Sequence, residues 1–283
     1  MDTSLPDRPS VVEALTASLK SESRALLDEL TRCQKKPKMK RVHAVRTSAR
    51  RLLAALELAT VLGAEPKRRI VRGLTELLSA LSPLRDRQVQ QRALERLSEH
   101  HADVSALSAR LRSQERELSD QASRRLADFD AKEFRHHVAT LAQQLEATAT
   151  SAQAPGAAQT AIHGELARRH LQVSRRRGRA SADDARSLHR LRLALKSYRY
   201  GLAAVETALP AAARGLSEAV TRLQDQLGEA HDAHVLAEAA KGTKKSGPPR
   251  RARRLSRNLA HQSRVAQRAA AEAVNGAVLE WPL

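Results

Sequence analysis

VHAVRTSARRL, residues 42–52, has the spacing of an amphipathic helix, and LHRLRLALKSYR, residues 188–199, has the same spacing. At about 100° per residue, His43, Arg46 and Arg50 fall within one narrow arc of the first segment. Each segment is therefore predicted to form a helix with a cationic stripe about 15 Å long, which suits an extended anion better than one small phosphate. The stripe of the second segment consists of His189, Arg192, Lys196 and Arg199.

An apolar stripe lies beside each cationic stripe and not on the opposite side of the helix. In the first segment it includes Val45, Ala49 and Leu52, and in the second it includes Leu191 and Leu195. A solvated charged face normally lies opposite the buried face of a helix. Charges that flank the buried stripe instead predict a groove between helices that is lined by cations.

The offset of 146 residues between His43 and His189 persists further along the chain. At this offset Arg85-Asp86 corresponds to His231-Asp232, and several apolar positions match as well. We interpret the pattern as an internal duplication, in which each half is too small to close a core of its own. The predicted first helical repeat is 1–150, and the predicted second is 151–283.

Length and composition indicate the fold class. The chain has 283 residues, of which 41% are hydrophobic, so it is long enough to bury a core. Aromatic residues make up only 2%, and strong helix formers such as Ala and Leu are abundant. We therefore predict an all-α fold.

Capping and turn residues set the expected helix boundaries. Ser10 is predicted to cap the first helix, with Glu13 completing a capping box. Pro83 is predicted to start a helix and Gly228 to end one. Asp86 and Asp232 would then lie in first turns, where the helix dipole is one explanation for an acidic residue and a place in a functional site is the other. The other helices are expected over about 43–63, 67–81, 161–177, 189–208, 210–227 and 250–275, and two or three more are expected between Pro83 and residue 146. A linker is predicted at 147–159 and a mobile basic loop at 241–249.

The charge of the chain narrows the class of partner. A net charge of +19 and an isoelectric point near 11.2 predict a polyanion or an anionic surface. The aromatic residues are too few and too scattered to stack on single-stranded bases, and no glycine-rich phosphate loop is present. No residues with the spacing of a metal site or a catalytic constellation stand out. We expect no catalytic residue, no metal and no cofactor.

The cellular compartment is expected to be the cytoplasm. The single cysteine, Cys33, leaves no internal disulfide to form. No apolar stretch approaches the roughly 20 residues that are needed to span a bilayer. The first residues also lack the basic and apolar regions of a secretion signal.

Four motifs carry the resemblance of this chain to a known family. They are His43-x-x-Arg46-x-x-x-Arg50-Arg51, Leu84-Arg85-Asp86-x-x-Val89, Leu188-His189-x-x-Arg192-x-x-x-Lys196-x-x-Arg199 and Leu227-Gly228-x-x-His231-Asp232-x-x-Val235. Together they resemble the CHAD family, the conserved histidine α-helical domain, over roughly residues 10–275. The resemblance implies two pseudo-symmetric helical bundles around a central basic channel or cavity that binds inorganic polyphosphate without catalysis, and an association with polyphosphate granules.

The resemblance also implies which residues contact polyphosphate. The chain departs from the family pattern at Leu53 and Ser197, where a cation is often found, and at His231, which replaces the usual Asn or Arg. These departures bear on affinity and symmetry. We expect Arg46→Ala to weaken polyphosphate binding several-fold while helicity stays intact. The implied contacts are His43, Arg46, Arg50, Arg51, Arg85, His189, Arg192, Lys196 and Arg199.

Two other functions are compatible with the sequence. The first is a nucleic-acid-binding protein that uses phosphate contacts, which the charge permits and the absence of base-reading elements weakens. The second is an enzyme that acts on polyphosphate or on a nucleotide. Competition between polyphosphate and duplex DNA separates the first alternative, and phosphate release with added metal tests the second.

Overall fold

The computed structural model describes residues 8–98, 105–150, 155–241 and 250–279, and these ranges are helical with no strand among them. The predicted all-α fold is therefore confirmed. The helices are α1 Val11–Lys35, α2 Met39–Val61, α3 Arg68–Ser98, α4 Ser105–Ala127, α5 Ala131–Thr150, α6 Pro155–Arg177, α7 Ala185–Ala204, the short 3-10 helix η2 Glu206–Ala208, α8 Ala211–Lys241 and α9 Arg250–Gly276.

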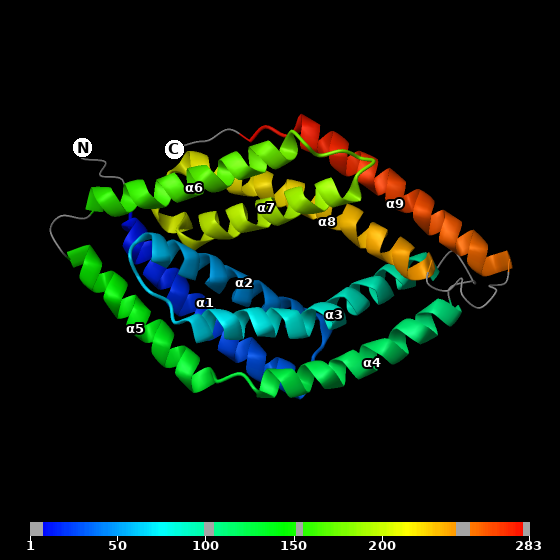
Figure 1. The fold of residues 1–283 in the computed structure, drawn as a ribbon, viewed down its shortest axis with the longest axis horizontal. Helices are drawn as coiled ribbons and strands as arrows, with labels where there is room; N and C mark the ends of the chain where they lie inside the picture. Colours follow the sequence, from blue (N-terminus) through cyan, green and yellow to red (C-terminus); the bar gives the residue numbers. More distant parts are fainter. Residues whose placement is uncertain (1–7, 99–104, 151–154, 242–249, 280–283) are drawn as a thin grey trace, which may run out of the picture.

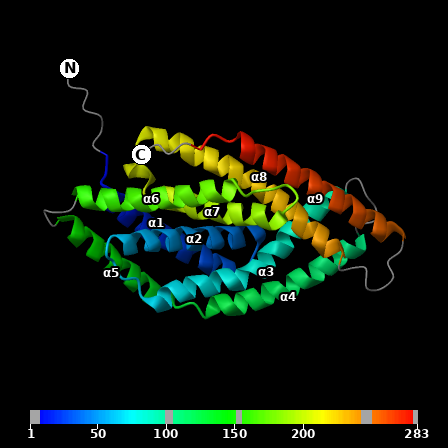
Figure 2. The same cartoon turned by 45° about the horizontal axis from the view of Figure 1, so that its top comes forward.

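The helices form an elongated molecule in which α1–α5 lie on one side and α6–α9 on the other (Figure 1). Neighbours in sequence pack as antiparallel pairs, with α1 against α2, α3 against α4, α6 against α7 and α8 against α9. The two sides meet where α2 packs against α7 and where α3 contacts α8. The contact of α2 with α7 is visible again when the molecule is turned (Figure 2). The helices predicted to carry the cationic stripes are thus direct neighbours.

The ends of the chain's first and last described helices follow the sequence signals. Ser10 caps α1, since its Oγ accepts from the Glu13 backbone N–H at 3.2 Å and the Glu13 carboxylate accepts from the Ser10 N–H at 2.7 Å. At the other end, α9 covers the expected range within one residue. Both predictions are confirmed.

Two predicted helix boundaries are wrong because tertiary packing overrides the local signals. Pro83 lies inside α3, and Leu81 and Leu84 on either side of it are completely buried. The packing of these side chains keeps the helix continuous despite the lost backbone hydrogen bond. Gly228 likewise lies inside α8. A Cβ atom at Gly228 would lie 3.9 Å from Arg192 Nε, so the glycine stands where α8 approaches a side chain of α7.

The expected linker at 147–159 is also wrong for most of its length, because α5 continues to Thr150 and α6 begins at Pro155. The helix at His189 ends at Ala204, and η2 follows it before Pro210. Two helices, α4 and α5, fill the stretch for which two or three were expected. The predicted basic loop lies, apart from Lys241, in residues 242–249, outside the described residues.

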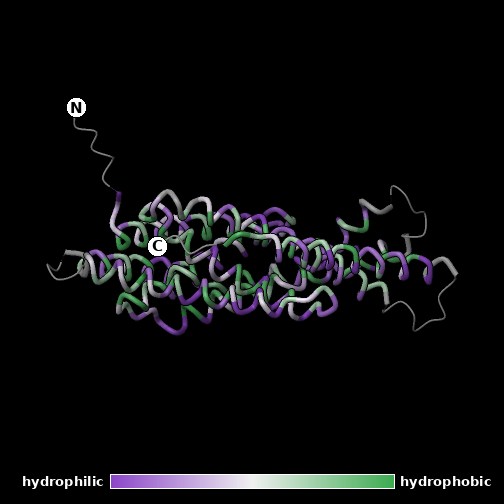
Figure 3. Tube along the Cα trace, turned by 90° about the horizontal axis from the view of Figure 1, so that it is seen from above, coloured by the Kyte–Doolittle hydropathy of each residue, from purple (hydrophilic) through white to green (hydrophobic). Residues whose placement is uncertain are grey.

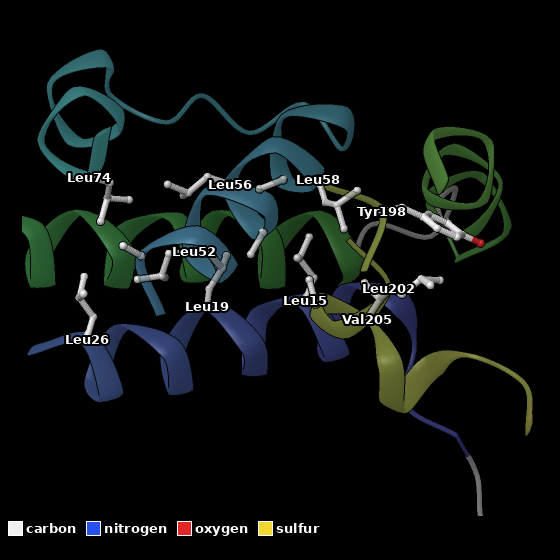
Figure 4. Packing of buried hydrophobic residues seen from close by; sticks show 14 of the residues in the cluster. Leu15, Leu19, Leu26, Leu52, Leu56, Leu58, Leu74, Tyr198, Leu202 and Val205 are labelled. Atoms are coloured by element: carbon white, nitrogen blue, oxygen red, sulfur yellow. The ribbon is translucent and has the colours of Figure 1, made fainter. Parts of the chain in front are cut away.

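A large hydrophobic cluster joins helices from both halves of the chain (Figure 4). Leu19 of α1 and Leu52 of α2 point toward one another, and Tyr198 and Leu202 of α7 extend the cluster. Each fully buried leucine contributes about 1.5–3 kcal/mol of apolar transfer free energy. A smaller cluster lies where α3, α4, α8 and α9 meet, around Leu94. Hydrophobic segments run along the interior of the flattened molecule, with hydrophilic segments at its margins (Figure 3).

The described helices include none that is both long enough and apolar enough to cross a membrane.

The large hydrophobic cluster is built from small and medium side chains, with Ala49, Ala55 and Ala59 of α2 all completely buried. Small side chains allow neighbouring helices to approach closely. This close approach places the cationic faces of α2 and α7 beside one another.

A buried arginine connects three of the helices. The Arg169 side chain on α6 donates from Nη1 to the Ser197 carbonyl oxygen of α7 at 3.1 Å. It also donates from Nη2 to Glu57 of α2 at 3.0 Å and from Nε to Glu165 at 2.8 Å. A Cβ atom at Gly201 would come within 3.0 Å of Arg169 Nη1, so only glycine leaves room for the guanidinium there. Arg169 therefore fixes α6 against the α2–α7 contact.

Replacement of Arg169 by Met is expected to lower the free energy of unfolding by about 2–3 kcal/mol, because the buried guanidinium and its hydrogen bonds to Glu165, Glu57 and the Ser197 carbonyl are lost together. Chemical denaturation followed by circular dichroism measures this change. Arg168→Met is the matched control, since Arg168 is exposed and its ion pair with Glu165 is worth about 1 kcal/mol or less. Equal losses in the two variants would contradict the structural role of Arg169.

Candidate functional site

The two predicted cationic stripes meet between α2 and α7. Lys196 of α7 lies close enough to Arg46 and Arg50 of α2 for their positive charges to lower its pKa. Lys196 and Arg50 are also close enough to His43 of α2 for their positive charges to contribute to its lowered pKa. Residues that are far apart in sequence thus share one electrostatic environment. The structure brings the stripes together, as a groove lined by cations requires.

Two more helices contribute charges to this region. Arg85 of α3 interacts electrostatically with Asp232 of α8 and with Arg50. Arg192 of α7 interacts with the same Asp232 and with Asp86 of α3. We call this set the cationic cluster and its two carboxylates the central aspartates. The cationic cluster consists of His43, Arg46, Arg50, Arg85, His189, Arg192, Lys196 and Arg199, and the central aspartates are Asp86 and Asp232.

Lys196 is the most perturbed member of the cationic cluster. Burial, together with the nearby charges of Arg192, Arg50 and Arg46, lowers its pKa from 10.5 to about 7. Burial is also the main cause of the lowered pKa of His43 and of His189. Both histidines are therefore mainly neutral near pH 7, where they can donate one hydrogen bond each. A polyanion would reverse these shifts by supplying the missing negative charge.

Several buried donors of the cationic cluster have no hydrogen-bond partner within the described part of the protein. They are Arg85 Nη1, Arg192 Nε and His189 Nδ1. Buried polar groups in folded proteins are nearly always hydrogen-bonded, so each exception needs an explanation. Oxygen atoms of an anionic ligand would satisfy these donors.

Arg46 also has a structural role. It is 7% exposed, and its Nη1 donates to the Leu78 carbonyl oxygen at 2.9 Å and to Ser82 Oγ at 2.6 Å. These bonds tie α2 to α3 next to Pro83. Arg46→Ala would remove them together with a charge of the cluster. The substitution is therefore expected to lower stability in addition to any effect on affinity, which makes Arg50 the cleaner residue with which to test ligand contact.

Arg51 lies apart from the cationic cluster. Its Nη1 donates to Glu22 of α1 at 2.7 Å, and its side chain is half exposed. Adjacent residues on a helix point about 100° apart, which explains why Arg50 faces α7 while Arg51 faces α1.

Arg199, the last member of the second stripe, lies over the Tyr200 ring with its Cζ 4.9 Å from the ring centroid.

His231 of α8 stands in one of the four motifs but not among the implied contacts, and the structure places it beside His189. Its ring packs against that of His189, with centroids 4.8 Å apart and an angle of 33° between the planes. Burial and the charge of Arg192 lower the pKa of His231 to about 4, so the stacked rings are neutral at pH 7. The offset that relates His43 to His189 also relates Arg85 to His231, and this correspondence was the available signal.

The central aspartates have a different position from the one expected. Asp86 lies in the middle of the 31-residue α3, and Asp232 lies in the middle of α8, so neither is in a first turn. The helix-dipole explanation is therefore wrong for both. Burial raises the pKa of each carboxyl, against the opposing effect of the arginines around it. They act as internal counter-ions for Arg46, Arg85 and Arg192.

A search of the described residues finds no group of histidine, cysteine and acidic side chains placed to hold a metal ion. The arrangement is one of hydrogen-bond donors and cations that four helices contribute to one region. Its chemistry is that of anion binding.

Comparison with known proteins gives the family. The sequence model of the CHAD domain family matches residues 17–241, so the chain belongs to this family. The crystal structure of the CHAD domain from the plant Ricinus communis is similar, with a TM-score of 0.73 and 20% identity, over 99% of this chain and 96% of that one. PptA from Streptomyces chartreusis has a TM-score of 0.60 and 18% identity, over 94% and 98%. No curated protein sequence matches significantly.

Proposed function

We propose that this protein binds inorganic polyphosphate through the cationic cluster, without catalysis, and that it targets or organises polyphosphate granules in the cytoplasm. The main support is the set of buried donors without partners, Arg85 Nη1, Arg192 Nε and His189 Nδ1. A second support is the low pKa of Lys196, which indicates that the free site carries more positive charge than its own carboxylates neutralise. Family membership is consistent with a phosphate-containing ligand.

The depth of the donors favours a bare phosphate chain over a nucleic acid. The unpartnered atoms of Arg85 and Arg192 are shielded from solvent by the surrounding helices. A phosphate chain carries no bases and is narrow, so its oxygens need far less room among the helices than a duplex does. The phosphates of duplex DNA are attached to a wide, stiff helix that binds best to exposed basic surfaces. DNA contact is expected at the outer surface and to be more sensitive to salt.

Calorimetric titration at about 0.15 M salt tests this function, with polyphosphate of defined chain length and duplex DNA compared at equal phosphate concentration. Saturable binding of polyphosphate, with weaker and strongly salt-dependent binding of DNA, is the expected result. Equal or tighter binding of DNA would overturn the proposal. Release of phosphate from polyphosphate or nucleotides after addition of a divalent metal would show an enzyme instead.

Asp232→Asn is expected to raise the affinity for polyphosphate several-fold, because the ligand no longer competes with a carboxylate for Arg85 and Arg192. The same titration measures the change. Asp225→Asn on the exposed part of α8 is the control of equal charge change. A lower affinity in the Asp232 variant would mean that the carboxylate orients the arginines for the ligand and does not compete with it.

A further inference from the structure

A cavity of about 580 Å³ opens beside the cationic cluster, between α3, α8 and α9, and the proposed function does not use it. Two of its lining residues, Arg85 and Asp232, also belong to the cluster or its central aspartates, so the cavity borders the cluster.

Most of this lining is unsuited to a bare phosphate chain. Met39, Val89, Leu236 and Leu259 present apolar surface, which cannot replace the hydration of a phosphate. The carboxylate of Glu229 would repel it. Binding sites for small organic molecules, in contrast, have mainly apolar walls with a few polar groups, and volumes of about 300–1000 Å³. The cavity has this composition and size.

The polar groups of the cavity restrict the ligand. Arg85 belongs both to the cavity wall and to the cationic cluster, and it keeps a buried donor without a partner. Met39 is the first residue of α2, where the N-cap Lys38 supplies no side-chain hydrogen bond to the free backbone N–H groups. Both features favour a phosphate. Glu229 and the amide of Gln262 can accept hydrogen bonds from hydroxyl or amino groups.

We propose that this cavity holds the nucleoside part of a nucleoside polyphosphate, whose phosphates lie on Arg85 and the cationic cluster. The apolar faces of a base fit the apolar wall, the hydroxyl groups of a ribose and the polar edge of the base fit the acceptors, and a chain of phosphates fits the cations. This inference rests on the proposed function, since the phosphates occupy the same cluster. The protein would then accept two kinds of ligand, a bare phosphate chain and a chain that ends in a nucleoside.

The test compares adenosine triphosphate with tripolyphosphate by calorimetry in metal-free buffer, because both carry three linked phosphates and only one carries a nucleoside. We expect the nucleotide to bind about tenfold more tightly to the unmodified protein. Ala233→Trp fills the cavity and is expected to remove this difference, while the affinity for long-chain polyphosphate changes less than twofold. Ala80→Trp is the matched control, since Ala80 lines a separate cavity of about 650 Å³ between α3, α4 and α5.

The outcomes separate the two proposals. If the unmodified protein binds both small ligands equally but still binds long-chain polyphosphate, the nucleoside site is wrong and the proposed function stands. If it binds none of the three, the proposed function fails. If Ala233→Trp does not fold, as judged by its circular dichroism, Ala93→Trp fills the same cavity from α3 and replaces it. A preference for the nucleotide that survives cavity filling would also overturn the assignment.

Discussion

Replacement of Arg50 and Arg192 by Gln in one variant is expected to lower the affinity for long-chain polyphosphate by about 100-fold or more. Each guanidinium would make charge-assisted hydrogen bonds to phosphate oxygens, which contribute about 1.5–3 kcal/mol apiece. The two residues come from α2 and α7, and each affects the pKa of Lys196. Their replacement therefore removes one positive charge from each side of the site, and calorimetric titration at constant salt measures the result.

The neighbouring arginines provide a control with the same change in net charge. Arg51 pairs with Glu22, and Arg190 pairs with Asp184 at 3.4 Å on an exposed face of α7. The double variant Arg51→Gln with Arg190→Gln should bind polyphosphate within about twofold of the unmodified protein, because surface ion pairs contribute little. Similar losses in the two double variants would mean that net charge, and not the cationic cluster, determines binding.

The second large effect is expected from pH. Lys196 has a pKa of about 7 in the free protein, and phosphate oxygens in contact with it would return the pKa toward 10.5. The bound state then holds a proton that the free state loses above pH 7. Affinity should accordingly be highest below pH 7 and fall by up to about tenfold per pH unit between pH 7 and 9. The charged and titratable groups that face Lys196 are His43, Arg46 and Arg50 on α2, His189, Arg192 and Arg199 on α7, and His231 and Asp232 on α8.

Titrations in buffers of different ionisation enthalpy test this prediction directly, because the heat reports proton uptake on binding. Uptake of about one proton per site is expected at pH 8. In Lys196→Met the affinity should be lower at pH 7 and nearly independent of pH between 7 and 9. The histidines carry lowered pKa values and titrate in a more acidic range, so they do not produce this decline. An unchanged slope in the Met variant would assign the pH dependence to another group.

Periodicity along single helices predicted the main parts of the site. The positions of His43 and Arg50 on α2, and of His189 and Lys196 on α7, follow from a spacing that any α-helix enforces. The all-α fold follows from composition. The helix boundaries predicted at Pro83 and Gly228 are wrong, because they depend on tertiary packing that local sequence does not show. This packing buries Leu81 and Leu84 and brings α7 close to α8.

Other features needed the spatial arrangement as well. Arg51 differs from Arg50 only in direction, and the presence of Glu22 beside it comes from the packing of α1. The stacking of His231 on His189 depends on where α8 crosses α7. Burial of Lys196, which shifts its pKa, depends on the packing of α2 against α7. The cavity beside Arg85 is formed by side chains from α2, α3, α8 and α9, and most of them lie outside the motifs.

The ion pair between Arg51 and Glu22 bears on how the charge of this protein should be read. The 50 lysine and arginine residues of the chain suggest a large store of cations for any polyanion. Part of that store is already engaged inside the molecule, since Lys20 pairs with Glu146 and Arg169 with Glu57 in the same manner. Stoichiometry is therefore governed by the cations without carboxylate partners. Among proteins of equal isoelectric point, the capacity to hold phosphate will differ with the number of such unmatched charges, which only a folded structure reveals.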